Sequence, residues 1–159
     1  MQASLSNQPG RVPAGQPVAD AGTEAIAPGR LPRAAGLAGV VAVVTDLVVY
    51  FVARALWGVP GEYATFFNPI AIVATAAAGV AVAAVGLAIL ARLTRRPLRI
   101  FVPAAVVVTL LSLAGPLQAL AGAMPGMPPA TAATGMTMVA MHLVTGGVIA
   151  GLLPTRARR

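Results

Sequence analysis

Two ionisable side chains lie inside long apolar runs of the sequence. Asp46 lies in the first run, which begins directly after Arg33, and His142 lies in the last run of the chain. An ionisable group at the centre of a membrane-spanning helix costs about 2.5–3.5 kcal/mol on insertion scales, so both residues need an explanation. Because a carboxylate and an imidazole can exchange a proton or bind a cation, this pair is the first candidate for chemistry.

Depth along the predicted helices places these groups in one layer. At a rise of 1.5 Å per residue, Asp46 lies about 14 Å, His142 about 16 Å and Ser112 about 15 Å from the same end of their runs. Pro116 has no N–H, so it leaves the carbonyl of Ser112 without its helical hydrogen bond and is expected to kink the helix. The sequence therefore predicts an intramembrane polar layer of Asp46, His142 and Ser112, with a kink at Pro116.

Two interpretations of this layer are open. In the first, Asp46 and His142 form a pair that carries a proton or a cation, and Ser112 supports the pair. In the second, both groups are neutral and hydrogen-bond between helices, where such contacts contribute about 0.6–2 kcal/mol each. Intramembrane ionisable residues are often functional, although one pair is not a pathway across the membrane.

Methionines cluster beside His142, and five of the six lie between Met124 and Met141. Thioether and imidazole ligands suit Cu(I), but methionine also fills irregular gaps in apolar cores. Met136 and Met138 point about 200° apart on a helix, so they cannot both face one site. We therefore predict no metal site. The absence of cysteine excludes thiolate ligands and disulfides.

The sequence carries no signature of an enzyme. It has one histidine, no pair of carboxylates on one predicted helix, no glycine-rich phosphate loop followed by lysine, and no HExxH motif. Glu62 lies in a predicted loop beside Tyr63 without an evident partner. We expect a non-enzymatic protein with no catalytic residue and no cofactor.

The elements that position these residues follow from composition. Of 159 residues, 58% are hydrophobic and 9% are charged, whereas soluble domains carry about 25% charged residues. So few charges cannot cover the surface of a small soluble protein, so we expect an integral membrane protein.

Four apolar runs are long enough to cross a bilayer. About 20 residues span its ~30 Å hydrocarbon core, and in lipid the backbone must be paired within helices. The sequence predicts an all-α four-helix transmembrane bundle over residues 34–153, with spans at 34–53, 69–91, 100–122 and 131–153. Residues 1–33, rich in proline and glycine, are predicted to form a disordered cytoplasmic tail, and residues 154–159 a basic cytoplasmic tail.

Arginines set the predicted orientation. The chain has eleven arginines and no lysine, and most lie in the link between the second and third spans or at the two ends of the predicted bundle. The positive-inside rule then places both termini in the cytoplasm. The net charge of +7 is distributed in short groups that flank spans, so the expected partners are anionic lipid headgroups rather than nucleic acid.

The first apolar run has an alternative interpretation as a signal peptide that is cleaved near Ala53 and Ala55. Signal h-regions contain about 7–15 residues and follow a short basic segment. Here the run has 20 residues and follows a tail of 33 residues. We therefore favour a retained membrane span.

Gly147 and Gly151 form a GxxxG pair in the fourth span, a spacing that lets helix backbones approach closely. They lie about 140–180° around the helix from His142. The face of His142 also holds Gly135, Met138, Thr145 and Gly146. The face of Gly147 and Gly151 packs either within the same bundle or against a partner protein, and we favour packing within the bundle.

Two strings in the third and fourth spans carry a resemblance: LLSLAGPL at residues 110–117 and MHLVTGGVI at residues 141–149. With the RRPLR link, they resemble an uncharacterised family of small four-helix membrane proteins found mainly in actinobacteria. The resemblance covers about residues 34–153 and is most specific in the second half. The resemblance implies the four-span architecture and a location in the bacterial inner membrane. It implies no activity, substrate or catalytic residue.

Two functional hypotheses follow. The first is a non-enzymatic accessory or scaffold protein that packs in the bilayer against itself or against another membrane protein. The alternative is a small proton- or cation-translocating protein that uses the Asp46–His142 pair. They differ in whether these two side chains serve packing or transport.

Overall fold

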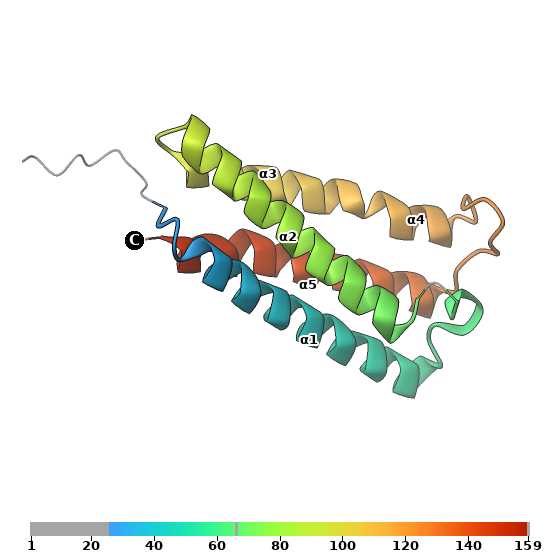
Figure 1. Ribbon diagram of the computed structural model, residues 1–159. Coiled ribbons are helices and arrows are strands. Elements are labelled where there is room, and N and C mark those ends of the chain that lie inside the picture. Colours follow the sequence, from blue (N-terminus) through green and yellow to red (C-terminus); the bar gives the residue numbers. More distant parts are fainter. Residues whose placement is uncertain (1–25, 66, 159) are drawn as a thin grey trace, which may run out of the picture.

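The computed structural model describes residues 26–65 and 67–158, which form an up-and-down bundle of helices (Figure 1). Four helical spans in this part of the chain are long and apolar enough to cross a membrane. The spans are α1 (Leu31–Trp57), α2 (Pro69–Leu93), α3 and α4 together (Pro97–Ser112 and Ala114–Leu120), and α5 (Ala132–Ala157). A short 3-10 helix, η1 (Gly61–Tyr63), follows α1. The predicted all-α four-helix class is confirmed.

Local sequence signals account for the helix boundaries. Proline occupies the first or second position of α1, α2 and α3, where its missing N–H would have no helical partner anyway. The side chain of Asn68 caps α2 by accepting hydrogen bonds at 3.1 Å from two backbone N–H groups of the first turn. Thr131 caps α5 in the same way and accepts from the N–H of Thr134 at 3.3 Å.

The third span is broken at Leu113, between α3 and α4. Pro116 lies in the first turn of α4 and has no N–H to donate to the carbonyl of Ser112. The break therefore lies three residues before the proline for which the sequence predicts a kink. Figure 1 shows α3 and α4 as consecutive segments of one rod.

α5 continues through Pro154 to Ala157, whereas the sequence predicts a basic tail from residue 154. A proline removes one helical hydrogen bond, but the residues after it again have N–H groups to donate. The hydroxyl of Thr155 also donates to the carbonyl of Gly151 at 2.9 Å. The last turn thus remains helical.

α1 begins at Leu31 instead of residue 34, and the segment before it is tied to the end of α5. The N–H of Ala27 donates to the carbonyl of Ala157 at 3.1 Å. Arg30 Nη1 donates to the carbonyl of Arg158 at 3.1 Å. Residues 1–25 of the predicted tail lie outside the described residues, so disorder there stays a prediction.

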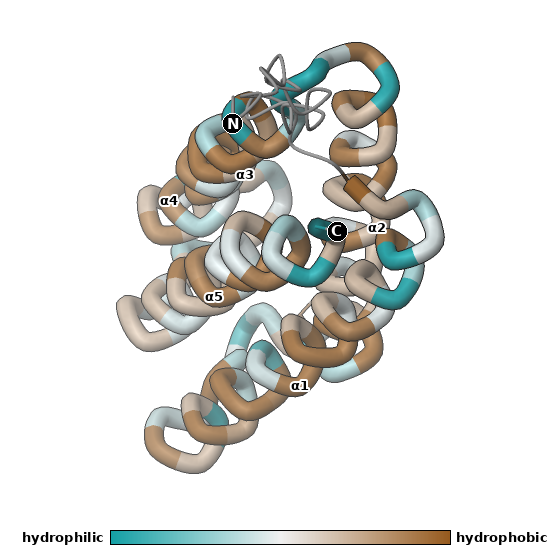
Figure 2. Tube along the Cα trace, turned by 90° about the vertical axis from the view of Figure 1, so that its left-hand side faces the viewer, coloured by the Kyte–Doolittle hydropathy of each residue, from teal (hydrophilic) through white to brown (hydrophobic). Residues whose placement is uncertain are grey.

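All described arginines except Arg54 lie at one end of the bundle, where α1 and α3 begin and α2 and α5 end. We call it the arginine-rich end, and the other the opposite end. In Figure 2 the helices are coloured mostly hydrophobic, and hydrophilic residues gather near the termini and turns. Large apolar side chains such as Val82 and Leu111 are exposed along the helices. Such an apolar surface is suited to contact with the hydrocarbon core of a lipid bilayer.

Two apolar clusters fill the interior. At the arginine-rich end, three alanines of α1 spaced by four residues pack with larger side chains that include Leu87, Phe101 and Leu153. At the opposite end, the cluster is built around Tyr50 and Tyr63. Small residues on one face of α1 let the neighbouring helices approach closely, and α1 packs mainly against α5 and α2.

Two close helix contacts of α5 occur at glycines other than the GxxxG pair. A Cβ built on Gly135 would overlap the side chain of Leu120, and one built on Gly146 would overlap that of Thr109. Nothing lies within 4 Å of a Cβ built on Gly147 or Gly151. The expectation that these two pack within the bundle is wrong, because they lie on the face of α5 that points away from the other helices.

Candidate functional site

Asp46 lies in the middle of α1 and is 5% exposed. The buried face of α1 repeats every four residues, through Ala38, Ala42, Asp46 and Tyr50, and places the carboxylate inside the bundle. An acidic side chain therefore interrupts an otherwise apolar interface.

Thr145 of α5 holds one oxygen of this carboxylate. Its hydroxyl donates to Asp46 Oδ2 over 2.6 Å, within the range of about 2.5–2.7 Å typical of O–H···O⁻ bonds. The bond links α1 and α5 across 99 positions of sequence. Helical spacing places Thr145 on the face of His142 without indicating a role for it. The three-residue spacing from His142 is the signal that could have identified it.

Asp46 Oδ1 is buried and has no hydrogen-bond partner, which is true of no other buried side-chain nitrogen or oxygen in the described part of the chain. Leaving a buried acceptor without a partner costs about 1–3 kcal/mol. One carboxylate oxygen is thus held in place, while the lone pairs of the other remain open to a proton donor or a cation.

His142 lies on α5 one turn before Thr145 and is half-buried. Its Nδ1 is 2.8 Å from the carbonyl oxygen of Met138, and since a carbonyl only accepts, Nδ1 carries the proton. Nε2 then accepts in the neutral ring and donates in the imidazolium. No hydrogen bond joins the ring to Asp46, whose Oδ1 has no partner.

Ser112 does not join these residues. Its side chain is exposed and donates to the carbonyl of Thr109 at 2.7 Å, within its own span. Depth arithmetic predicts a height along a helix but not the direction around it, and the Ser112 side chain is exposed instead of buried in the bundle. The polar layer in the structure therefore consists of Asp46, Thr145 and His142.

Tyr50 lies one turn beyond Asp46 toward the opposite end and is 1% exposed. Its ring packs edge-on against Phe67, with 5.5 Å between the centroids. Its hydroxyl accepts a hydrogen bond from Arg54 Nη1 at 3.2 Å. Arg54 is therefore engaged by Tyr50, which lies between it and the carboxylate of Asp46 along α1.

A second polar group joins two loops at the opposite end. Glu62 Oε1 accepts from the N–H of Thr131 at 3.0 Å, and the hydroxyl of Tyr63 donates to the carbonyl of Pro128 at 2.9 Å. We call these two contacts the loop clip. Hydrogen bonds from the backbone N–H groups of Glu62 and Thr131 hold the pKa of the Glu62 carboxyl below its usual range. The expectation that Glu62 has no partner is wrong, because the partner comes from a loop distant in sequence.

The methionines beside His142 do not converge on one site. Met141 is buried, while Met136 is 62% exposed on the outer surface of α5. In the described part of the chain, no group of three or more histidine, aspartate and glutamate side chains is arranged to hold a metal ion. The predicted absence of a metal site stays a prediction.

The chemistry open to the polar layer is narrow. A carboxylate with one fixed and one open oxygen can bind a proton or a monovalent cation, and an imidazole nearby can exchange a proton with it. The same three residues can also serve packing alone, through the bond between Asp46 and Thr145.

The chain was compared with family models, curated proteins and solved structures. A family model described as a family of unknown function (DUF6069) matches residues 26–159, which include all of the described helices. No curated protein and no solved structure matches the chain.

Proposed function

The chain belongs to the DUF6069 family, whose function is unknown, and from its own residues we propose that it is a non-enzymatic accessory or scaffold protein of the membrane. In this proposal it acts by packing laterally against a second copy or against another membrane protein. The single histidine and the lack of enzyme motifs support the non-enzymatic part.

The outward face of α5 carries this proposal. Gly147 and Gly151 are exposed, four residues apart, and a Cβ on either would meet nothing within 4 Å. In a bilayer the hydrophobic effect does not drive helices together, so association depends on close backbone approach at small residues. Glycines serve no packing purpose inside this bundle at these positions, whereas a helix docked from outside would use them.

The test fills this face. Gly147→Leu combined with Gly151→Leu is expected to abolish association of the full chain in liposomes, measured by energy transfer between labelled copies and by cross-linking in cells. Gly115→Leu is the matched control, because Gly115 is also exposed and a Cβ there would meet nothing within 4 Å. Association that is equal in the double variant and in the wild type would contradict the proposal.

We also propose that the arginine-rich end faces the cytoplasm of a bacterial cell and that the protein lies in its inner membrane. The clustering of Arg92, Arg95 and Arg156 at one end supports this orientation by the positive-inside rule. The chain has no cysteine, so a single cysteine introduced at Thr94 can be labelled selectively. Labelling of intact cells by a reagent that does not cross membranes would refute the orientation.

Proton or cation translocation is a second candidate, favoured by the unpartnered Asp46 Oδ1. Asp46→Asn or His142→Gln would then abolish flux in liposomes while leaving association unchanged. Glu62→Gln is the control, because its carboxylate lies outside the spans. Wild-type liposomes without flux above empty ones would eliminate this candidate and leave the accessory function untouched.

A further inference from the structure

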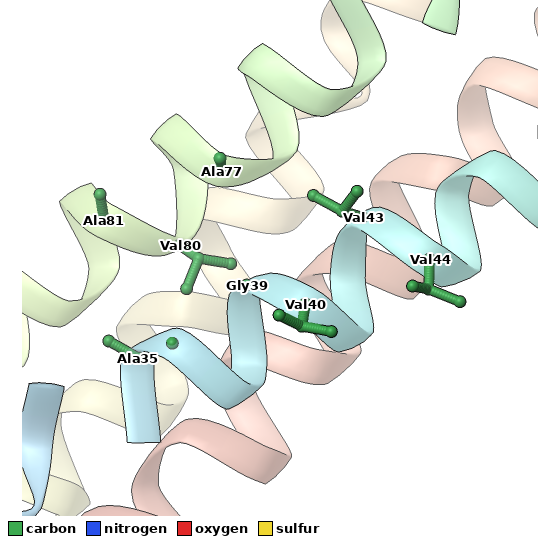
Figure 3. Close-up of a pocket in the computed structure, with 9 residues that line it drawn as sticks. Ala35, Gly39, Val40, Val43, Val44, Ala77, Val80 and Ala81 are labelled. Atoms are coloured by element: carbon green, nitrogen blue, oxygen red, sulfur yellow. The ribbon is translucent and has the colours of Figure 1, made fainter. Parts of the chain in front are cut away.

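A groove of about 490 Å³ lies between α1 and α2 on the outer surface of the bundle (Figure 3). Its lining consists entirely of alanine, glycine and valine. On α1 it extends from Ala35 to Val44, and on α2 it includes Ala77 and Ala81. No side chain along it offers a hydrogen bond, so an occupant of the groove must be apolar there.

Missing side chains on α1 create the hollow. A Cβ built on Gly36 or Gly39 would meet nothing within 4 Å, so both positions are open space. Val80 of α2 is 2% exposed and forms part of the floor. In Figure 3 its side chain points from α2 toward α1 near Gly39.

The length of the groove matches one leaflet of a bilayer. The nine residue steps from Ala35 to Val44 correspond to about 14 Å at 1.5 Å per residue. Half of the hydrocarbon core is about 15 Å. A spanning helix of another protein would follow the surface across both leaflets, whereas a lipid acyl chain ends at the midplane. Val44 lies two residues before the central Asp46, so the groove ends near that level.

Positive charge lies two residues before Ala35, where the groove begins on α1. Arg33 is exposed and precedes Gly36 by three residues and Val40 by seven, so all three share one face of α1. Long side chains of a helix point toward its N-terminus, which carries the guanidinium toward the membrane surface. The acidic residues in the described part of the chain, Asp46 and Glu62, lie elsewhere.

We propose that the groove binds one acyl chain of an anionic phospholipid from the leaflet at the arginine-rich end, with the phosphate held at Arg33. The planar guanidinium of arginine matches phosphate geometry with two parallel hydrogen bonds. The proposal is independent of the association surface, because the groove lies on α1 and α2 and the glycine pair on α5.

The test uses the full chain in detergent with equal amounts of phosphatidylglycerol and phosphatidylcholine, and counts retained lipids by native mass spectrometry. The wild type is expected to retain one phosphatidylglycerol. Gly36→Leu with Gly39→Leu fills the groove and is expected to lose the bound phosphatidylglycerol. Arg33→Gln is expected to lower the preference for phosphatidylglycerol about fivefold, the contribution of one arginine near an anionic surface.

Gly79→Leu is the matched control, because Gly79 does not line the groove and a Cβ there would meet nothing within 4 Å. It is expected to retain lipid like the wild type. If the groove-filling variant fails to fold, Val40→Phe replaces it, since Val40 is 62% exposed and lines the groove.

Three results would overturn the proposal. One is equal lipid retention in the wild type and the groove-filled variant. Another is a wild type that retains phosphatidylcholine and phosphatidylglycerol in equal amounts. The third is disulfide-linked dimer formed by Val40→Cys in liposomes, which would show that a second copy occupies the groove.

Discussion

Replacing Gly146 by alanine tests the close approach of α5 to α3. A Cβ at this position would overlap Cγ2 and Oγ1 of Thr109 and would lie 2.8 Å from the Thr109 Cβ. Threonine is stiff about χ1, and its hydroxyl is engaged by the carbonyl of Ala105 at 2.8 Å. The Thr109 Cβ is fixed to the backbone, so the two helices must separate to admit the new methyl group.

The expected magnitude follows from two opposing effects. Inserting a methyl group into a packed interface costs about 1–3 kcal/mol, while alanine is favoured over glycine in a helix by about 0.8–1.0 kcal/mol in water. Within a single copy of the chain, Gly147→Ala has only the second effect, because nothing in that copy lies within 4 Å of a Cβ built there. Two neighbouring substitutions of the same type should therefore differ by about 1–3 kcal/mol in the free energy of unfolding.

Equilibrium unfolding in mixed micelles, titrated with sodium dodecyl sulfate and followed by circular dichroism, measures this difference. Thr109→Ala removes the two nearest atoms, so the double variant Gly146→Ala/Thr109→Ala should recover part of the loss, with a coupling of about 0.5–3 kcal/mol. Equal free energies for Gly146→Ala and Gly147→Ala, or no coupling with Thr109, would refute the close approach.

The remaining predictions concern the polar contacts. Thr145→Val leaves both Asp46 oxygens without a donor and should lower the free energy of unfolding by about 1–3 kcal/mol in the same titration. Thr155→Val is the control, because the Thr155 hydroxyl bonds only within its own helix. A loss for Thr145→Val no larger than that for Thr155→Val would contradict this prediction. Tyr63→Phe removes the hydrogen bond to the carbonyl of Pro128. It should lower the free energy of unfolding by about 0.5–1.5 kcal/mol and speed the exchange of backbone amides near Pro128. Because the pKa of Glu62 is lowered in the folded state, its contribution is present above its ordinary pKa and is lost as the pH falls through the folded value. The thermal unfolding temperature should therefore fall in acid more for the wild type than for Glu62→Gln, and parallel curves of this temperature against pH would refute the loop clip.

Hydropathy predicts the spans of this protein well because the bilayer imposes a minimum length and a paired backbone on every crossing segment. Helix ends were less accurate. α1 starts three residues earlier than expected and α5 runs through Pro154 to Ala157. The hydrogen bond from Ala27 to Ala157 joins the segments beside these two ends, and no local sequence signal indicates it.

The candidate site was predicted in part. The sequence identifies Asp46 and His142 because an ionisable residue in an apolar run stands out, and depth arithmetic brings them to one level. It also assigns Ser112, which points outward, and it gives no role to Thr145, which donates to the carboxylate. The rise per residue sets height, but partner choice depends on the rotation of each helix.

By itself, the sequence determined the medium, the number of spans and the end at which the arginines gather, since all three depend on composition along the chain. Only the tertiary structure decided which face of each helix points inward. In a soluble helix an apolar stripe marks the buried face, whereas these helices are apolar all round and carry no such mark. The shapes of the packed helices therefore decide that Gly146 faces inward while Gly147 faces outward, and that a groove lies beside Gly39.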